Sequence, residues 1–248
     1  MISIVICGRD KEISPNLFNN INTTIGVPYE LIYIDNSENT LNLFSAYNKG
    51  VLASNYELIC FMHDDIIYKT THWGSLVIDK FSSSEVGAIG VAGTPYVSYF
   101  PGPWWASSLV AQNIIQENKQ TTLNYTSTLH NQHITPVILL DGVWLCIRKS
   151  IFKQIHFDDF NFNGFHMYDM DISMQIFDKG YKLFCIYDIL LEHKSIGKLN
   201  KNWVNNRIQF YKKWRKKLPL SIVPLSWIDT INMEFKNLFS FLIILLKK

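Results

Sequence analysis

Short apolar runs alternate with helix-like segments through the first part of this chain. The apolar runs cover residues 2–7, 30–34 and 57–62, and the intervening residues 15–21 and 41–53 have the composition and spacing of helices. Strands that alternate with helices predict parallel βαβ units in a doubly wound α/β sheet. Ligands bind such sheets at the carboxyl ends of the strands.

Polar residues follow each of the three apolar runs, where a ligand is expected. Arg9 follows the first run, Asp35 the second, and His63, Asp64 and Asp65 follow the third. Two adjacent carboxylates repel each other unless a cation lies nearby, and a hard divalent metal accepts oxygen ligands and can also hold a diphosphate. A solvated turn or a helix N-cap remains the alternative for the two aspartates.

The middle of the chain has a strand pattern broken by loops. A strand predicted over residues 86–91 leads to a Pro/Gly-rich loop that carries Trp104 and Trp105. Adjacent tryptophans in a rigid loop either form a wall that stacks on a sugar or anchor the loop to the core. The polar residues 112–133 are expected to form a loop or hairpin, and strand character resumes over 136–147.

A second pair of carboxylates lies at the start of a predicted helix. Asp169 and Asp171 precede a helical segment that is closed by Gly180. Either can serve as the N-cap, and a helix N-terminus lowers the pKa of a carboxylate and keeps it ionised, as a general base requires. His193, which follows a strand predicted over 181–187, is either structural or a metal ligand.

Composition narrows the class of protein. Hydrophobic residues make up 48% and charged residues 18% of the 248 residues, which supplies a buried core and argues against disorder. The length fits one large α/β domain or a domain with a C-terminal appendage. We assign the α/β domain to residues 1–200 and C-terminal helices to residues 201–248. Four scattered cysteines without a CxxC spacing predict buried, reduced thiols in a cytoplasmic protein. No apolar run reaches the roughly 20 residues of a membrane-spanning helix.

The last fifth of the chain combines a basic helix with an amphipathic one. Basic residues gather between 207 and 217, and they form a solvated face or meet a phosphate, a nucleic acid or an anionic membrane. Large apolar residues then recur at helical spacing: Leu225, Ile228, Ile231, Phe235, Leu238, Phe239, Leu242 and Ile243. This stripe is expected to dock on the domain or to pair with a second copy, with peripheral membrane contact as the alternative.

The order and spacing of several segments resemble those of bacterial GT-A fold glycosyltransferases, most closely the inverting family 2-like group. The segments are IVIC, YIDNS, AYNKG, MHDD, DGVWLCIRKSIF, GFHMYDMDISMQIFDKGYK and EHKSIG, within residues 2–197. The resemblance implies a Rossmann-like, mostly parallel central sheet flanked by helices, with a C-terminal helical appendage. It also implies a cytoplasmic enzyme, or one peripheral to the inner face of the cell membrane, that acts in surface polysaccharide synthesis.

The resemblance further implies the reaction and its ligands. The donor would be a nucleoside-diphosphate-sugar, with a UDP-sugar favoured, and the acceptor a hydroxyl of a glycan or a lipid-linked molecule. Asp35 and Asp64 would contact the nucleotide, and Arg9 joins them from the same sheet edge. Asp65 and His193 would bind Mn²⁺ or Mg²⁺ that bridges the donor diphosphate.

The same resemblance makes Asp169 the candidate catalytic base. His63 stands where the family often has an aspartate, so this chain departs from the usual metal motif. Contacts with the acceptor or the donor sugar are expected at Trp104, Trp105, Asp141, Gly142 and Asp171.

Two other functions compete with glycosyl transfer. The histidine in the metal motif is consistent with a catalytically silent module that binds nucleotide-sugars. A nucleotidyltransferase would also use metal-bound aspartates on an α/β sheet. It is disfavoured because the residues after the first strand, Gly8 to Lys11, lack a Gly-rich, Lys-containing phosphate loop. No nucleic-acid partner is expected.

Overall fold

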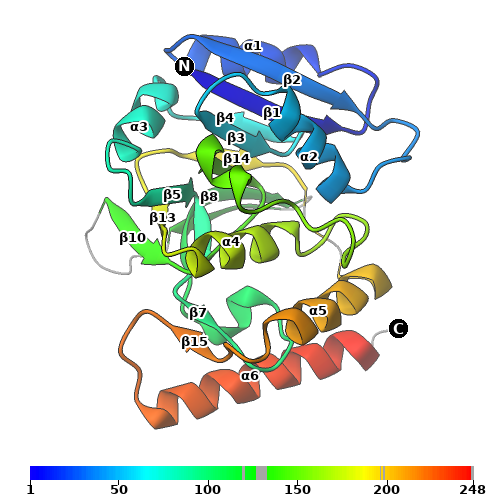
Figure 1. Cartoon of the computed structure of the whole chain (residues 1–248), viewed down its shortest axis with the longest axis vertical. Helices are drawn as coiled ribbons and strands as arrows, with labels where there is room; N and C mark the ends of the chain where they lie inside the picture. The colour runs from blue at the N-terminus through cyan, green and yellow to red at the C-terminus, as the bar shows by residue number, and fades with distance from the viewer. Residues whose placement is uncertain (119–120, 127–132, 196, 198, 247–248) are drawn as a thin grey trace.

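The computed structural model describes residues 1–118, 121–126, 133–195, 197 and 199–246 (Figure 1). In this part of the chain the central sheet has the strand order β10-β13-β5-β12-β3-β1-β2. Strands β2, β1, β3, β5 and β13 run parallel, and β12 and β10 run against them. The bounds are β1 Ile2–Gly8, β2 Tyr29–Asp35, β3 Leu58–Met62, β5 Val86–Gly90, β10 Ile134–Val137, β12 Trp144–Arg148 and β13 Lys182–Ile186. The mostly parallel sheet that the alternating pattern predicts is therefore present.

A second sheet has the order β11-β6-β8-β14-β4 and borders the ligand edge of the first. Its strands are β4 Ile66–Tyr68, β6 Ala92–Thr94, β8 Ala111–Asn118, β11 Leu139–Leu140 and β14 Leu191–His193. Strand β9, Thr121–Thr126, pairs antiparallel with β8, so a hairpin occupies the polar excursion, apart from residues 119–120 and 127–132, which lie outside the described residues. The short strands β7, Tyr96–Val97, and β15, Leu220–Ser221, pair with each other.

Helices cover the sheet on both faces. They are α1 Pro15–Thr24, α2 Leu43–Ala53, α3 Trp73–Lys80, α4 Tyr168–Asp178, α5 Lys201–Trp214 and α6 Trp227–Leu246, with 3₁₀ turns η1 Trp104–Ser107 and η2 Lys149–Lys153. Ser14, Asn42 and Asn200 cap α1, α2 and α5, because each side chain accepts a hydrogen bond from a backbone N–H of the first turn. Pro15 supports the start of α1, since a proline there loses no helical hydrogen bond.

Alternating residues of β1 pack into two hydrophobic cores, one on each face of the central sheet. Ile4 and Ile6 pack with α1 and α3, whereas Val5 packs on the other face among residues of α2 and α4. Trp203 of α5 and Phe241 of α6 join this second core. The C-terminal helices are thus packed against the body, at the end of the molecule away from β1 and β2 (Figure 1). Among the described helices, none combines the length and apolar character needed to cross a membrane.

The expectation of four reduced cysteines is wrong for two of them. Cys60 and Cys146 form a disulfide, and their Cα atoms lie 4.0 Å apart. The two residues are directly opposite each other on the antiparallel strands β3 and β12, and both are fully buried. A pairing between strands 86 residues apart is invisible in the spacing of the cysteines. The cysteine pattern therefore gives no support to a cytoplasmic location.

Candidate functional site

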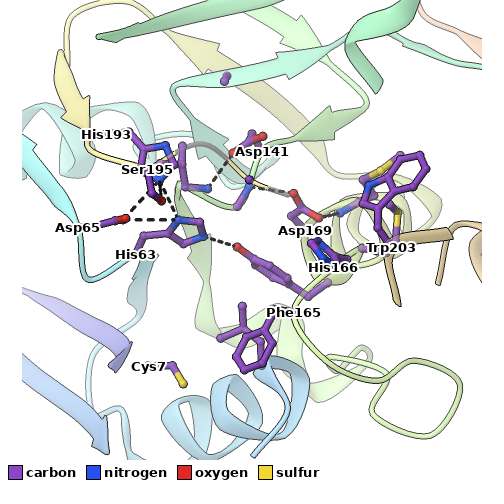
Figure 2. A pocket seen from close by; sticks show the side chains of 18 of the residues that line it. Cys7, His63, Asp65, Asp141, Phe165, His166, Asp169, His193, Ser195 and Trp203 are labelled. Atoms are coloured by element: carbon purple, nitrogen blue, oxygen red, sulfur yellow. Dashed lines mark hydrogen bonds and ion pairs between the residues drawn. The ribbon is translucent and has the colours of Figure 1, made fainter. Parts of the chain in front are cut away.

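A cavity of about 990 Å³ lies at the carboxyl ends of β1, β2 and β3 (Figure 2). Its lining includes residues that directly follow these strands, among them Arg9, Asn36 and His63. The predicted site residues that line it are Arg9, Asp64, Asp65, Trp104, Trp105, Asp141, Gly142, Asp169 and His193. The sheet edge therefore collects most of the predicted set around one space.

His63, Asp65 and His193 point toward one another at one end of the cavity (Figure 2). Asp65 Oδ1 lies 3.3 Å from His193 Nε2 and 3.9 Å from His63 Nδ1, and the two imidazole nitrogens are 3.3 Å apart. Local pairing explains the arrangement. Strand β14 runs antiparallel to β4 with His193 opposite Ile66, the residue after Asp65. The backbone N–H of His63 is held by a hydrogen bond to the carbonyl of Val143.

The chemistry of this cluster fits a divalent metal ion. Asp65 Oδ1 is buried and has no hydrogen-bond partner among the described residues, although buried carboxylate oxygens ordinarily have one. Burial alone would raise the pKa of Asp65, but the neighbouring His193 and Ser195 outweigh it and hold the pKa below its usual value. Burial and the adjacent His193 lower the pKa of His63, which favours the neutral imidazole that binds metals. Ligands at adjacent corners of an octahedral ion would stand about 3 Å apart, and two of the three spacings found, both 3.3 Å, are close to this.

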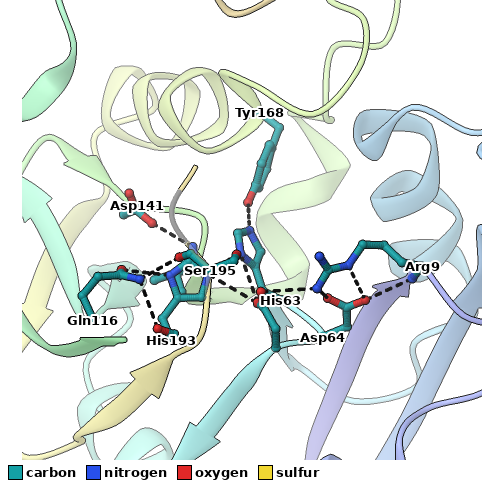
Figure 3. A network of polar contacts seen from close by, with 10 residues as sticks. Arg9, His63, Asp64, Gln116, Asp141, Tyr168, His193 and Ser195 are labelled. Carbon is teal, nitrogen blue, oxygen red and sulfur yellow. Dashed lines mark hydrogen bonds and ion pairs between the residues drawn. The ribbon is translucent and has the colours of Figure 1, made fainter. Parts of the chain in front are cut away.

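A second set of side chains holds the two imidazoles in place (Figure 3). The hydroxyl of Tyr168 lies 2.9 Å from His63 Nε2, on the side of the ring away from Asp65. Gln116 Oε1 lies 3.1 Å from His193 Nδ1, and the Gln116 amide donates to the carbonyls of His193 and Ser195. Each imidazole therefore has one nitrogen directed at the cluster and the other nitrogen in contact with a side chain: Tyr168 for His63 and Gln116 for His193. Such partners fix ring orientation and tautomer in metal sites.

Arg9 joins β1 to the acidic pair at the end of β3 (Figure 3). Its guanidinium contacts both oxygens of Asp64, at 2.7 and 3.1 Å, and its backbone N–H donates to the same carboxylate. Arg9 Nη2 also lies 3.3 Å from Asp65. The Arg9 side chain is 69% exposed, so it reaches these groups across the open side of the cavity. It provides a positive charge beside the cluster of His63, Asp65 and His193.

Asp169 lies in the first turn of α4 and faces the cavity from the side opposite His193. The prediction that Asp169 or Asp171 caps this helix is wrong, because the N-cap is Met167, at φ 71°. The carboxylate of Asp169 instead accepts hydrogen bonds from the backbone N–H groups of Gly142 and Met170.

The expected lowering of the Asp169 pKa is also wrong. Burial, followed by the nearby charge of Asp141, raises the pKa of Asp169 to about 7, although the two backbone hydrogen bonds oppose this. A helix N-terminus favours the charged form only modestly, whereas removing a carboxylate from water penalises it strongly. The result suits a general base near neutral pH, because the ionised and protonated forms are then both accessible.

Two predicted residues lie outside the cavity lining. Asp171 is 1% exposed and is held by Lys213, Trp214 and Gln175 at 2.7 to 2.9 Å, so it joins α4 to α5 and cannot contact an acceptor. The expectation of an acceptor contact there is wrong, since Lys213 and Trp214 come from α5, a helix far along the chain. Asp35 is exposed at the end of β2, next to the lining residues Asn36 and Ser37.

The other end of the cavity is aromatic. Trp104 and Trp105 from η1 meet edge to face, with ring centroids 5.5 Å apart, and Trp105 is 46% exposed. Trp104 and Trp105 form this aromatic wall, and Phe165 and Trp203 also line the cavity. Flat aromatic faces of this kind stack on the apolar faces of sugars. Gly142 borders the same space, and a Cβ there would collide with the ring of Tyr168, so the close approach requires glycine.

A family model described as "Glycosyltransferase like family" matches residues 3–218. The chain belongs to this glycosyltransferase-like family. The enzyme class inferred from the motifs is thereby confirmed. No curated protein matches the chain significantly.

Solved structures show the fold of this glycosyltransferase. GalNAc-T7 with UDP, GalNAc and Mn²⁺ superposes with a TM-score of 0.55 at 13% identity, covering 86% of this chain and 50% of GalNAc-T7. The mannosyltransferase PcManGT from Pyrobaculum calidifontis, in complex with GDP-Man and Mn²⁺, gives 0.54 at 10% identity and covers 99% of this chain and 74% of that protein. Both are GT-A glycosyltransferases, so the predicted fold class is confirmed.

Sequence reasoning missed three residues that shape the site. His63 was expected only to depart from the usual metal motif, and its Nδ1 is the third potential ligand. The His-x-Asp order was a usable signal, because imidazole is a common metal ligand. Tyr168 and Gln116 had no local signal, since their contacts bring together segments 105 and 77 residues apart.

Proposed function

We propose that this glycosyltransferase transfers a sugar from a nucleoside-diphosphate-sugar to an acceptor hydroxyl by single displacement with inversion. One observation carries the proposal: the His63, Asp65 and His193 cluster and the carboxylate of Asp169 face the same cavity from different elements. The cluster suits the diphosphate end of a donor, and the aromatic wall suits a sugar. The fold-sharing enzymes solved with nucleotides and Mn²⁺ support this class of ligand.

The proposed reaction uses Asp169 as the base. Its carboxylate takes the proton of the acceptor hydroxyl as the oxygen bonds to the anomeric carbon, and the bond from that carbon to the diphosphate oxygen breaks. The leaving diphosphate keeps the electron pair. Arg9 offers a positive charge to it, and Mn²⁺ or Mg²⁺ held by His63, Asp65 and His193 would supply Lewis-acid stabilisation of that charge.

The remaining assignments of the proposal follow from position in the cavity. Asp64, with Arg9 bound to it, and the exposed Asp35 lie on the edge where the nucleotide is expected, with a UDP-sugar as the favoured donor. Trp104 and Trp105, with Asp141 and Gly142, border the space for the donor sugar and the acceptor. A glycan or a lipid-linked molecule would provide the acceptor hydroxyl, in the synthesis of a surface polysaccharide.

Ligand binding and turnover test the proposal separately. A thermal-shift screen of UDP, GDP and other nucleoside diphosphates should show stabilisation by one nucleotide that is larger with Mn²⁺ than without it. Incubation with the matching nucleotide-sugars and Mn²⁺ should release the nucleoside diphosphate from one donor, with water taking the place of the acceptor hydroxyl. Binding without release of diphosphate would instead identify a catalytically silent module. Absence of binding to every nucleotide would contradict the proposal altogether.

A further inference from the structure

The outer face of α6 carries an apolar stripe that the described part of the chain leaves exposed. Its members are Ile228, Ile231, Phe235, Phe239, Leu242 and Leu246. At 3.6 residues per turn these positions fall within an arc of about 80°, along a helix about 30 Å long. Phe235, Phe239 and Leu246 are 66%, 67% and 84% exposed. A continuous apolar surface of this size ordinarily marks an interaction site.

The opposite face of α6 is locked onto the protein, so the helix cannot rotate to bury the stripe. Glu234 accepts hydrogen bonds from the hydroxyls of Tyr96 and Ser98 and from the backbone N–H groups of Tyr99 and Phe100. Asn237 is 1% exposed, and its backbone lies so close to Gly102 that a Cβ on that glycine would clash with it. The contacts of the inner face therefore keep the apolar outer face of α6 exposed to solvent.

Charge is segregated toward the same end of the molecule. Residues 201–248 contain ten of the 23 Lys and Arg and only two of the 21 Asp and Glu, so this segment has a formal charge of +8 and residues 1–200 have −6. Lys213 and Lys217 are paired with carboxylates. Lys212, Arg215 and Lys216 are exposed at and just beyond the end of α5, the helix beside α6 (Figure 1).

We propose that α6 binds the surface of an anionic lipid bilayer, with its apolar stripe buried at the boundary between headgroups and acyl chains. Exposed Trp227 at the start of the helix is a residue type enriched in that interface. Basic residues near an amphipathic helix add attraction to anionic lipids. The charge argues against a second copy of this chain as the occupant, because pairing two such helices would bring the exposed Lys212, Arg215 and Lys216 of both copies toward one another. The surface is independent of the transfer reaction.

Flotation of the full chain with lipid vesicles tests this binding. The wild type should float with vesicles of phosphatidylcholine and phosphatidylglycerol, and about tenfold less with phosphatidylcholine alone or at high salt. The double variant Phe235→Asp/Phe239→Asp should lose at least about tenfold in the bound fraction. Phe160→Asp is the matched control, because Phe160 is 93% exposed on a loop elsewhere and should bind as the wild type does.

The remaining outcomes overturn the proposal. Failure of the wild type to float with anionic vesicles would do so, as would equal flotation of the wild type and the Phe235/Phe239 variant. Light scattering provides the competing result: a wild-type dimer that becomes a monomer in that variant, without vesicle binding, assigns the stripe to a second copy. None of these readouts uses a nucleotide-sugar, so they succeed or fail independently of the proposed transfer reaction. Circular dichroism of each variant checks that the fold is retained.

Discussion

The carboxyl group of Asp169 is subject to opposing effects. Burial and the charge of Asp141 favour its protonated form, whereas hydrogen bonds from Gly142 and Met170 favour its ionised form. The first two effects dominate and raise the pKa to about 7. A proposed base with such a pKa makes the reaction sensitive to pH in the physiological range.

Replacement of Asp169 by Asn should reduce transfer about 10²–10⁴-fold, because general base catalysis contributes about that much. In the wild type, transfer should rise with pH and level off above about 7, since only ionised Asp169 can accept the proton. Initial rates across pH, with nucleotide binding followed by thermal shift, measure both effects. Loss of nucleotide binding in Asp169→Asn, or a rate that falls as pH rises through 7, would contradict the role as base.

Substitution of His63 tests whether the cluster of His63, Asp65 and His193 binds a metal ion. Removing one of three ligand atoms should weaken Mn²⁺ binding, so His63→Ala should lower the affinity at least about tenfold. Isothermal titration with Mn²⁺ measures this change. His156→Ala is a matched control, because His156 is exposed and lies outside the cavity lining. Equal affinities in the two variants would remove His63 from the ligand set.

Tyr168 acts on the cluster only through His63 and is therefore a positioning residue. Its hydroxyl lies 2.9 Å from His63 Nε2, and by accepting a hydrogen bond from Nε2–H it would leave Nδ1 free for a metal. Tyr168→Phe should lower Mn²⁺ affinity about 10-fold to 100-fold, the usual effect of losing such a partner. NMR of the His63 ring should show a shifted tautomer population in the variant. An unchanged tautomer would show that the hydroxyl has no positioning role.

At the scale of elements, Glu234 attaches α6 to the loop that leads to η1. Four donors converge on its carboxylate. Glu234→Ala should therefore cost about 3 kcal/mol of unfolding free energy, since hydrogen bonds to a charged group are strong and the donors lose their partner. Asp229→Ala, at the exposed first turn of α6, is the control and should cost less than about 1 kcal/mol. Urea denaturation compares the two, and similar losses would contradict the anchoring role.

The succession of elements could be predicted because it is encoded locally. Apolar runs, helical spacing and a closing glycine mark β1, α1, β2, α2, β3 and the end of α4 within three residues of their actual positions. The contacts between elements could not be predicted in this way. His193 reaches Asp65 because β14 pairs with β4, and Asp171 is occupied because α5 packs on α4. Neither pairing has a signature in the separate segments.

In the candidate site, too, the position of residues along the strands could be predicted from the sequence, but properties that depend on distant contacts could not. The rule that ligands bind at strand ends correctly placed Arg9, Asp64 and Asp65 around one cavity. The charge state of Asp169 could not be predicted from the sequence, because its pKa depends on burial and on Asp141 from another part of the chain. Partners from distant segments decide such properties, and they are known only once the chain is folded.

At the scale of the whole molecule, the raised pKa of Asp169 affects stability. An unfolded aspartate has a pKa of about 3.9, so the folded state binds this proton more tightly and loses stability as the pH rises from about 4 to about 7. Asp169→Asn should therefore be more stable than the wild type by a few kcal/mol at pH 8 and about equally stable at pH 4. Urea denaturation at the two pH values tests this. A difference that does not change with pH would contradict the raised pKa.

If α6 binds a bilayer as proposed, its position also determines how far the cavity lies from the lipid. Its inner face supports η1, which carries Trp104 and Trp105, while its outer face carries the apolar stripe. A helix is about 10 Å thick, so a bilayer bound to the stripe would hold the aromatic wall about that far above the boundary between headgroups and acyl chains. The enzyme would then select acceptors by height. A hydroxyl on a long headgroup could reach the cavity, whereas one at the level of the acyl chains could not.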